Sequence, residues 1–435
     1  MHGILRRREQ EVDIFGDYLS YVRESEPPIH YHRWCYLSLL GASIGRRAYF
    51  SFGHFRIFPN LYTMLIGEPA ARKSTSIKMA KNLLSASGYT AFAADKTSKE
   101  KFLLDLEGVE DETHLASGRA GDKGKLDAVT AETLWGDDGR EPREVFVVAD
   151  EFNEFSGTGN TEFYTTLGNL WDWDNPDAPF THRLKNSRSV KIFQPTISIL
   201  SGNTPELFSR AFPPESLGTG FLSRLLLIHG ERSGRRITFP PPPDALLGEK
   251  LKTFLRRLGG NEFGEIGRSR SAEVLLDDIY QNGQELPDIR FRAYSNRRFS
   301  QLLKLCLILA AAKFRVEIDE DDVIQANTIL SHAELLMPKA LGEFGKSRNS
   351  EVANKIMELL ERATKPVTTK DIWAQVHKDL NGQRELVELL GGLVQAEKIQ
   401  MISKPFPGFL PKKLVKKDPI HVDWELITDE ERSMI

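Results

Sequence analysis

Residues 60–78 read NLYTMLIGEPAARKSTSIK, an apolar run followed by a loop that ends in Lys73 and Ser74. The run 61–66 is typical of a buried strand, and a helix is expected after the loop. In a loop of this kind, backbone N–H groups surround phosphates at a helix N-terminus, where the dipole favours anions. Lys73 would reach the β- and γ-phosphates, and the Ser74 hydroxyl would bind Mg²⁺. The segment therefore predicts a site for ATP and Mg²⁺, lined by Gly67, Glu68, Pro69, Ala70, Ala71, Arg72, Lys73, Ser74 and Thr75.

The loop departs from the usual pattern G-x-x-x-x-G-K-[ST], because Arg72 stands where the last glycine is expected. Ala70 also occupies a position that is often glycine. Without glycine, the backbone there is expected not to adopt a positive φ without strain. An ordinary Gly-Pro turn before a helix is the alternative. Lys73 and Ser74 are in place, so we interpret the loop as functional.

The segment EVFVVADEF at 144–152 is the second signal, an apolar strand that ends in Asp150 and Glu151. Asp150 would hold Mg²⁺ together with Ser74. Glu151 would orient and polarise a water for in-line attack on the γ-phosphate. The alternative is a strand that ends in a solvated acidic turn, which a phosphate-binding loop upstream makes less attractive.

Two further polar residues stand at the ends of apolar runs. Asn203 ends the strand pattern PTISILSGN, where its amide could bind the γ-phosphate or the attacking water. An ordinary helix cap and turn at Asn-Thr-Pro is the alternative. Arg224 opens the run LLLIH, either as a local salt-bridge partner or as a catalytic arginine given to a neighbouring subunit.

The elements that must position these residues alternate between strand and helix patterns. Short apolar runs bounded by turns and separated by helices predict a largely parallel sheet with helices on both faces, an α/β fold. The expected strands are 61–66, 89–93, 145–149, 196–200 and 225–229, and the expected helices between them are 74–85, 98–106, 162–173 and 205–211. Residues 108–143 are polar and aperiodic and are interpreted as an insertion.

Beyond the prolines at 240–243, which suit a linker, the chain turns helical. Apolar spacing predicts helices over 299–312 and 320–336. From residue 351 onward, three helical patterns and a β segment with a Pro/Gly turn predict a winged helix. Phe406 and Phe409 in that turn could stack on bases or pack in a core.

Composition is that of an ordinary globular protein, with 40% apolar and 27% charged residues and a net charge of −3. A nucleic-acid site would therefore depend on local clusters of Lys and Arg. Cys35 and Cys306 lie in apolar helical patterns, which argues against disulfides and zinc and fits a reducing cytoplasm. No 18-residue apolar run or signal-like segment is present, so neither export nor a membrane is expected.

The chain resembles the AAA+ ring ATPases of the superfamily 3 and minichromosome-maintenance helicase branch. The resemblance lies in the order of four segments, GEPAARKS, FVVADE, SILSGN and FLSR. The chain most resembles phage and mobile-element proteins of that branch, whose helicase domain was long catalogued as a domain of unknown function. The resemblance implies Asn203 as sensor 1, Arg224 as arginine finger, and Arg297 or Arg298 as sensor 2. Two helical patterns over 10–45, of which WCYLSLLGASIG is the more apolar, predict an N-terminal helical collar (1–48). With the resemblance, the rest of the chain divides into an AAA+ core (49–239), a helical lid (240–345) and a winged-helix domain (346–435).

The same resemblance implies a ring, often a hexamer, with single-stranded DNA in its channel. In such rings a hairpin before sensor 1 grips the DNA backbone, and the basic segment FTHRLKNSRSVKIF at 180–193 fits that place. Lys185, Arg188 and Lys191 would neutralise phosphates there, although a solvated hairpin face is the alternative. Further basic residues of the C-terminal turn are Lys404, Lys412, Lys413, Lys416 and Lys417.

The sequence thus predicts an ATP-dependent DNA helicase that forms a homo-oligomeric ring and works with other replication proteins of a phage or mobile element. Two alternatives are a helicase loader or initiator, and a nucleotide-bound DNA-binding scaffold in which Arg72 has disabled hydrolysis.

Overall fold

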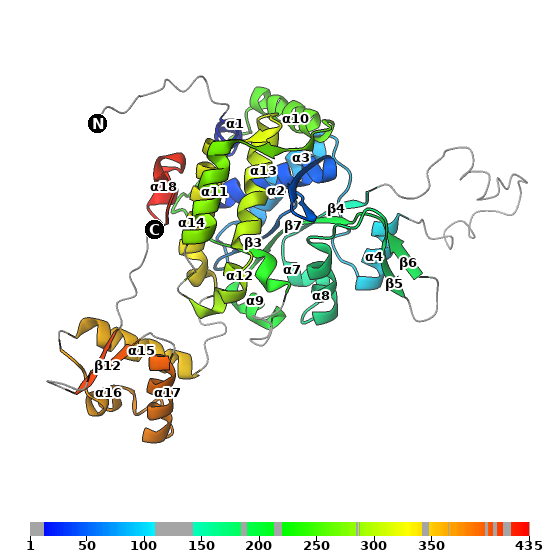
Figure 1. The fold of residues 1–435 in the computed structure, drawn as a ribbon. Coiled ribbons are helices and arrows are strands. Elements are labelled where there is room, and N and C mark those ends of the chain that lie inside the picture. Colours follow the sequence, from blue (N-terminus) through cyan, green and yellow to red (C-terminus); the bar gives the residue numbers. More distant parts are fainter. Residues whose placement is uncertain are drawn as a thin grey trace, which may run out of the picture. The chain divides into compact units, whose positions relative to one another are not determined.

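A computed structural model describes most of the chain. The described residues are 13–108, 142–183, 189–212, 220–283, 286, 288–341, 348–363, 365–395, 399–402, 407–411 and 419–434. The chain forms two compact units, of which the first comprises Met1–Gly342 and Pro419–Ile435 and the second comprises Glu343–Asp418 (Figure 1). The expected insertion at 108–143 lies almost wholly outside the described residues.

A four-stranded parallel sheet forms the centre of the first unit. Its strands, in spatial order, are β4 (Glu144–Ala149), β7 (Thr196–Asn203), β3 (Tyr62–Ile66) and β8 (Leu225–His229). Every residue of β3 and β7 is buried, which explains their nearly continuous apolar sequences. The predicted α/β fold with a parallel sheet is therefore confirmed. The expected strand 89–93 is reduced to one parallel bridge from Phe92 to Phe146.

Helix α2 (Ile29–Ile44) is buried along its whole length and packs on β3 and β7. It also contacts α3 (Lys73–Ala86), α10 (Ala245–Gly259) and α13 (Arg298–Ala312). The sequence analysis placed this helix in a collar beside the core. The structure corrects that expectation, because α2 is itself a core helix of the first unit.

The helices expected at 299–312 and 320–336 are present as α13 and α14 (Glu320–Leu341). They pack on each other, and α14 packs along β8. Helix α11 (Arg270–Asn282) also packs on α14. The region expected as a lid is therefore part of the same compact unit as the sheet.

Two hairpins complete the part of the first unit used below. Strands β1 (Ala48–Phe52) and β2 (Phe55–Ile57) are antiparallel, and β9 (Gly264–Glu265) joins β1 in parallel. Strands β5 (Phe180–Arg183) and β6 (Ser189–Ile192) form the second hairpin, in the place expected for 180–193.

The second unit consists, within its described residues, of α15 (Arg348–Arg362), α16 (Thr369–Val376), α17 (Gln383–Gln395) and the antiparallel strands β12 (Ile399–Ile402) and β13 (Gly408–Pro411). The Thr368 hydroxyl caps α16 by accepting a hydrogen bond from the Asp371 N–H. Buried Val352, Ile356, Ile372 and Leu386 join the helices in one core, and Phe409 packs against it. The expected three helices and hairpin are thus present. Phe406 and the basic residues Lys404, Lys412, Lys413, Lys416 and Lys417 lie outside the described residues.

The boundary expected at the C-terminus was wrong. Residues 419–434, here called the strap, pack with the first unit and include η5 (Trp424–Leu426) and α18 (Asp429–Arg432). The Arg33 guanidinium donates two 2.7 Å hydrogen bonds to the Glu431 carboxylate, and both side chains are buried. A polar sequence that ends the chain gave no hint of this long-range contact.

Candidate nucleotide-binding site

The predicted site residues meet at the carboxyl edge of the parallel sheet. Ile66, the last residue of β3, lies opposite Asn203 of β7, and α3 begins at Lys73 after a six-residue loop. Gly202 shows how tightly the elements converge. A Cβ atom there would lie 2.6 Å from the Asp150 carbonyl oxygen and 3.5 Å from the Lys73 Cβ. Lys73 and Asp150, far apart in sequence, therefore both lie beside the end of β7.

The loop 67–72 adopts the backbone conformation that glycine usually supplies. Ala70 has φ 67°, and Arg72 has φ 64° and ψ 24°, in the left-handed region. Such a conformation costs a non-glycine residue about 1–3 kcal/mol, and strain of this kind concentrates at functional sites. Ala70 and Arg72 thus adopt the positive φ that the sequence analysis expected only with strain. The Arg72 guanidinium is held by an ion pair with Glu26 at 2.5 Å.

The Lys73 side chain folds back toward the first residues of the loop. This side chain is 9% exposed, and its ammonium donates hydrogen bonds to the carbonyl oxygens of Gly67 (2.7 Å) and Glu68 (3.1 Å). Burial lowers the pKa of Lys73, while the nearby carboxylates of Glu151 and Glu68 oppose that shift. The ammonium therefore lies within the electrostatic reach of Glu151, as the predicted site requires.

The two acidic residues follow β4 directly. Asp150 forms a 2.7 Å ion pair with Lys78, a residue of α3 that the sequence analysis did not select. This hydrogen bond and the Asp150 charge raise the pKa of Lys78. Glu151 is half-buried and precedes α7 (Phe152–Ser156). On the first turn of α3, Ser74 is half-buried and Thr75 is exposed.

Asn203 has the most unusual environment in the site. Its side chain is fully buried, and within the described part of the chain neither its Oδ1 nor its Nδ2 has a hydrogen-bond partner. The alternative of an ordinary helix cap does not apply to it. The Thr204 hydroxyl caps α9 (Pro205–Ala211) instead, by accepting from the Leu207 N–H. An unpaired buried polar group costs about 1–3 kcal/mol, so this amide calls for a functional explanation.

Tyr31 of α2 fixes the start of the loop and was missed from sequence. Its hydroxyl lies 2.8 Å from the carbonyl oxygens of both Ile66 and Gly230. A Cβ atom at Gly67 would lie 2.4 Å from that hydroxyl, so the close approach requires glycine. A tyrosine 35 residues upstream, in an apolar helix, carries no sequence signal for this role.

The two predicted arginines lie elsewhere. Arg224 precedes β8, level with the start of β3, and is therefore at the sheet edge opposite the loop. It is 8% exposed, donates to the Gly220 carbonyl and pairs with Asp172 at 3.5 Å, which matches the local salt-bridge alternative. Arg298 pairs with Glu334 at 2.9 Å and also donates to Asn327 and Ser331, all within the helical region.

Arg297, the other residue considered for the same role, faces Asp172 at 3.6 Å. Arg232 does reach the loop, because its guanidinium donates to the Pro69 carbonyl at 3.1 Å. Arg232 follows β8, which ends at the same sheet edge as β3. That position along the chain was the signal that could have identified it.

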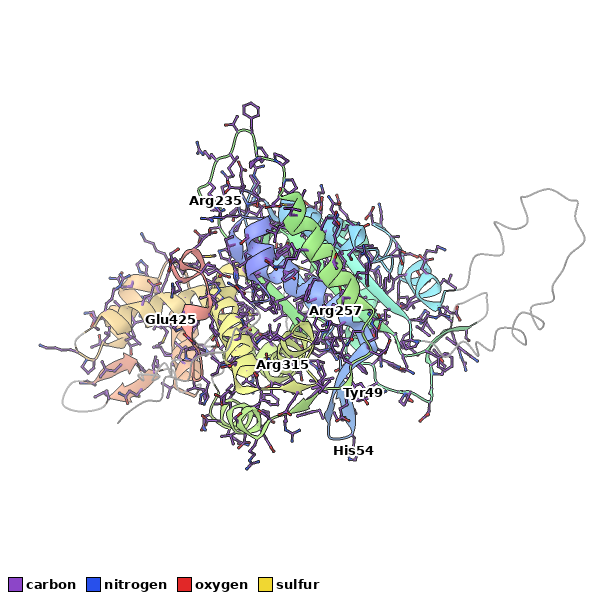
Figure 2. The ribbon with its side chains drawn as sticks, turned by 90° about the horizontal axis from the view of Figure 1, so that it is seen from above. Tyr49, His54, Arg235, Arg257, Arg315 and Glu425 are labelled. Atoms are coloured by element: carbon purple, nitrogen blue, oxygen red, sulfur yellow. The ribbon has the colours of Figure 1, made fainter. Side chains whose placement is uncertain are left out.

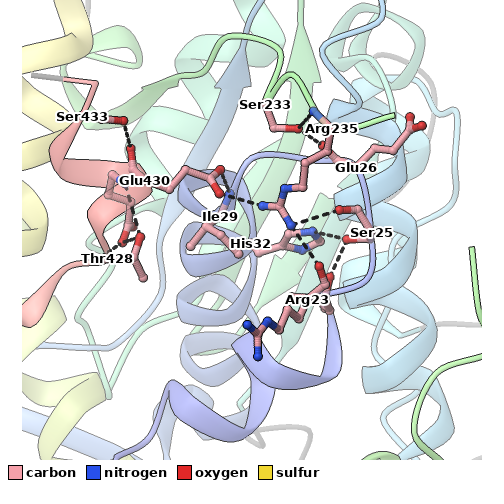
Figure 3. Close-up of polar contacts among 12 residues, drawn as sticks. Arg23, Ser25, Glu26, Ile29, His32, Ser233, Arg235, Thr428, Glu430 and Ser433 are labelled. Carbon is pink, nitrogen blue, oxygen red and sulfur yellow. Dashed lines mark hydrogen bonds and ion pairs between the residues drawn. The ribbon is translucent and has the colours of Figure 1, made fainter. Parts of the chain in front are cut away.

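A polar network links Glu26, the partner of Arg72, to the strap, and Figure 3 shows the part between Glu26 and Glu430. Glu26, the partner of Arg72, also accepts from the Ile237 N–H at 3.0 Å, and its carbonyl accepts from the Ser233 hydroxyl. Arg235 in turn pairs with Glu430 of the strap at 2.7 Å. Residues from three distant parts of the sequence are therefore linked to Arg72 through Glu26.

The hairpin β5–β6 presents one exposed and one buried face. Lys191 and Arg183 are exposed on the same face, whereas Val190 and Ile192 are buried on the other. The Lys191 N–H donates to Glu107 of α4 (Lys99–Glu107). Arg183 is a cation that the sequence analysis did not single out. Lys185 and Arg188 lie outside the described residues.

A comparison of the chain with known protein families finds no family that matches, and a comparison with curated proteins finds no match either. No helix in the described ranges is both long and apolar enough to cross a membrane. Those ranges also hold no group of three or more His, Cys, Asp or Glu side chains placed to bind a metal. An Mg²⁺ site of the expected kind needs fewer, because phosphates and waters complete the shell.

Proposed function

We propose that this chain is an ATP-dependent motor that acts on single-stranded DNA, as a ring-forming helicase of a phage or mobile element. The observation that carries the proposal is the convergence of the strained loop, Lys73, Asp150 and the unpaired amide of Asn203 at one sheet edge. Each alone has another explanation. Together these four features match what the binding of a nucleoside triphosphate with Mg²⁺ requires.

The residues fit these ligands by the chemistry of their donors. Loop N–H groups and the N-terminus of α3 would receive the phosphates, and the Lys73 ammonium would exchange two carbonyl oxygens for phosphate oxygens. Ser74 and Asp150 would hold Mg²⁺, with Asp150 leaving Lys78. Bound Mg²⁺ supplies charge stabilisation at the transferred phosphoryl group. Glu151 would orient the attacking water, and the Asn203 amide would gain the partners it lacks.

DNA binding is supported by the exposed cations Arg183 and Lys191 on one face of the β5–β6 hairpin. Contacts of this type neutralise phosphates and are insensitive to sequence, so binding would weaken as salt is raised. The three helices and hairpin of the second unit suit a winged helix, a common DNA-binding module.

The buried Arg224 favours a second candidate, a nucleotide-bound DNA-binding scaffold with slow turnover. A catalytic arginine must reach a neighbour's γ-phosphate, and here the guanidinium is engaged with Gly220 and Asp172. Phosphate release measured with and without single-stranded DNA separates the candidates: a motor is stimulated, whereas a scaffold stays slow. Unwinding of a forked duplex then separates a helicase from a loader or initiator.

The proposal is tested with two variants and a control on the same helix. Lys73→Ala should abolish ATP binding, because the loop loses its central cation. Glu151→Gln should bind ATP but not hydrolyse it. Lys81→Ala, which removes an α3 lysine paired with Asp95, should leave both properties unchanged. Wild-type turnover by Glu151→Gln would refute the role assigned to that carboxylate.

A further inference from the structure

An exposed proline segment of the first unit has no role in the site described above. Residues 238–243, TFPPPP, here called the proline arm, are exposed throughout. Phe239 is 88% exposed, which is unusual for a large aromatic side chain. Consecutive prolines favour the extended polyproline II conformation, which needs no internal hydrogen bonds. An exposed apolar segment with such restricted backbone freedom is typical of a binding element.

The arm also has a particular hydrogen-bonding character. Proline has no N–H group, so the tract offers carbonyl acceptors and no backbone donors. Its complement is a surface of aromatic rings that carry donors, because rings pack on proline and donors bind the free carbonyl groups.

The same chain carries such a surface, here called the aromatic groove. It is a cavity of about 570 Å³ lined by Phe50 and Phe52 of β1, Tyr280 of α11 and Phe299 of α13. The rings of Tyr280 and Phe299 meet edge to face at 4.8 Å. Phe52 is 46% exposed and Tyr280 is 63% exposed.

Donors surround these rings. Tyr280 contributes a hydroxyl, and Arg268 and Arg270 line the same cavity. Both arginines pair with Glu273, at 3.5 and 3.1 Å, which leaves further N–H groups of each guanidinium for a ligand. The groove therefore supplies what the arm lacks.

The arm cannot fill the groove of its own chain. It is fixed before Phe239 by the Ile237 N–H on Glu26, and after the prolines by Asp244, which caps α10. The 15 residues of α10 then span about 22 Å before the chain reaches β9, the partner strand of β1. Figure 2 accordingly shows Arg235 and His54, at the tip of the β1–β2 hairpin, on opposite sides of the first unit.

We infer that the proline arm of one copy docks into the aromatic groove of a second copy. Because the two surfaces differ and lie on opposite sides, the contact is head-to-tail and can close into a ring. The inference rests on the proposed function only in that it supplies the contact for the expected oligomer. The test of this contact requires neither nucleotide nor DNA. The contact can therefore be refuted while the proposed ATPase activity holds, and the ATPase activity can be refuted while the contact holds.

The test is a cross-link between two differently labelled copies. One copy carries Thr238→Cys, which leaves Phe239 and the prolines intact, and the other carries Ser51→Cys beside the groove. The native Cys35 and Cys306 are buried and do not compete. Mixed in the presence of a short bis-maleimide, the two should give a covalent heterodimer. The control replaces Ser51→Cys by Val387→Cys, an exposed site in the second unit, and should give none.

Sedimentation measurements supply an independent readout. Phe239→Ala and Tyr280→Ala should each weaken self-association at least about tenfold, as expected for an aromatic anchor and its pocket. The double variant should be little weaker than either alone, since both act on one contact. Both side chains are largely exposed, so the melting temperature should not change. Cross-linking no higher than with Val387→Cys, or unaltered masses, would overturn the inference in favour of a different partner for the arm.

Discussion

Replacing Asn203 by leucine should stabilise the protein and weaken the proposed nucleotide binding. The two side chains have the same number of heavy atoms and the same branching, but the methyl groups of leucine are larger than the amide atoms, so overpacking offsets part of the gain. Asn203 makes no side-chain hydrogen bond within the described residues, and it is fully buried. Removing its unpaired polar atoms contributes about 1–3 kcal/mol to the free energy of unfolding in the absence of ligand, so the net increase after overpacking should be smaller.

The ligand-dependent part has the opposite sign. At a nucleotide concentration of about 100 times the dissociation constant, binding stabilises the native state by about 2.7 kcal/mol. Loss of a hydrogen bond to a charged group, about 1.5–3 kcal/mol, weakens binding roughly ten- to a hundredfold. The stabilisation by the same concentration should then fall to about 1 kcal/mol in the variant.

The measurement is urea unfolding with and without Mg²⁺ and a non-hydrolysable ATP analogue. Unfolding is followed by tryptophan fluorescence. Trp373 lies in the second unit, so in a Trp373→Phe background the fluorescence reports on the tryptophans of the first unit. Thr204→Val is the matched control at the adjacent position. It removes the cap of α9 and should destabilise by about 1 kcal/mol while leaving the nucleotide increment intact. The reasoning is refuted if Asn203→Leu destabilises the unliganded protein, or if its nucleotide increment equals that of the parent.

Three further predictions concern packing, pH and the strap. Gly202→Ala should cost about 1–3 kcal/mol in chemical unfolding, because its Cβ would meet the Asp150 carbonyl at 2.6 Å, whereas Gly391→Ala in α17, which meets nothing, should not destabilise. Burial lowers the pKa of Lys304 to about 7 in the folded protein. Between pH 7 and about 10 the unfolded chain therefore binds more protons than the folded protein, and the free energy of unfolding should rise with pH. Urea titrations at pH 7–9.5 should show a smaller rise for Lys304→Met than for the parent, and equal rises would contradict this prediction. Glu430→Gln should speed amide exchange in α18 at a cost of at most about 1 kcal/mol, since the pair with Arg235 is partly exposed; unchanged exchange would contradict it.

Much of the fold could be predicted because local sequence determines it. Strands β3 and β7 are buried on both faces, and only a nearly continuous apolar run satisfies that condition. The loop after β3 and the acidic pair after β4 follow from the same logic, since the carboxyl ends of parallel strands share one sheet edge. The helices of the second unit were likewise visible in their apolar spacing.

Other features depend on contacts between distant parts of the chain and could not be predicted. Helix α2 was expected outside the core because an apolar helix does not reveal what surrounds it. Arg298 begins an apolar helix, and only its tertiary neighbours show that it pairs with Glu334 rather than reaching the loop. The strap is a polar segment. Its Glu431 can be buried because the Arg33 guanidinium donates two hydrogen bonds to its carboxylate.

The sequence by itself determined which residues stand at the ends of the strands, and hence which side chains could form a nucleotide site. The tertiary structure decided that Ala70 and Arg72 take positive φ, that Tyr31 and Gly202 set the spacing, and that Asn203 is buried without a partner. The physical reason is that periodicity and strand order are encoded locally. Strain, close approach and an unpaired amide arise only when separate elements pack together.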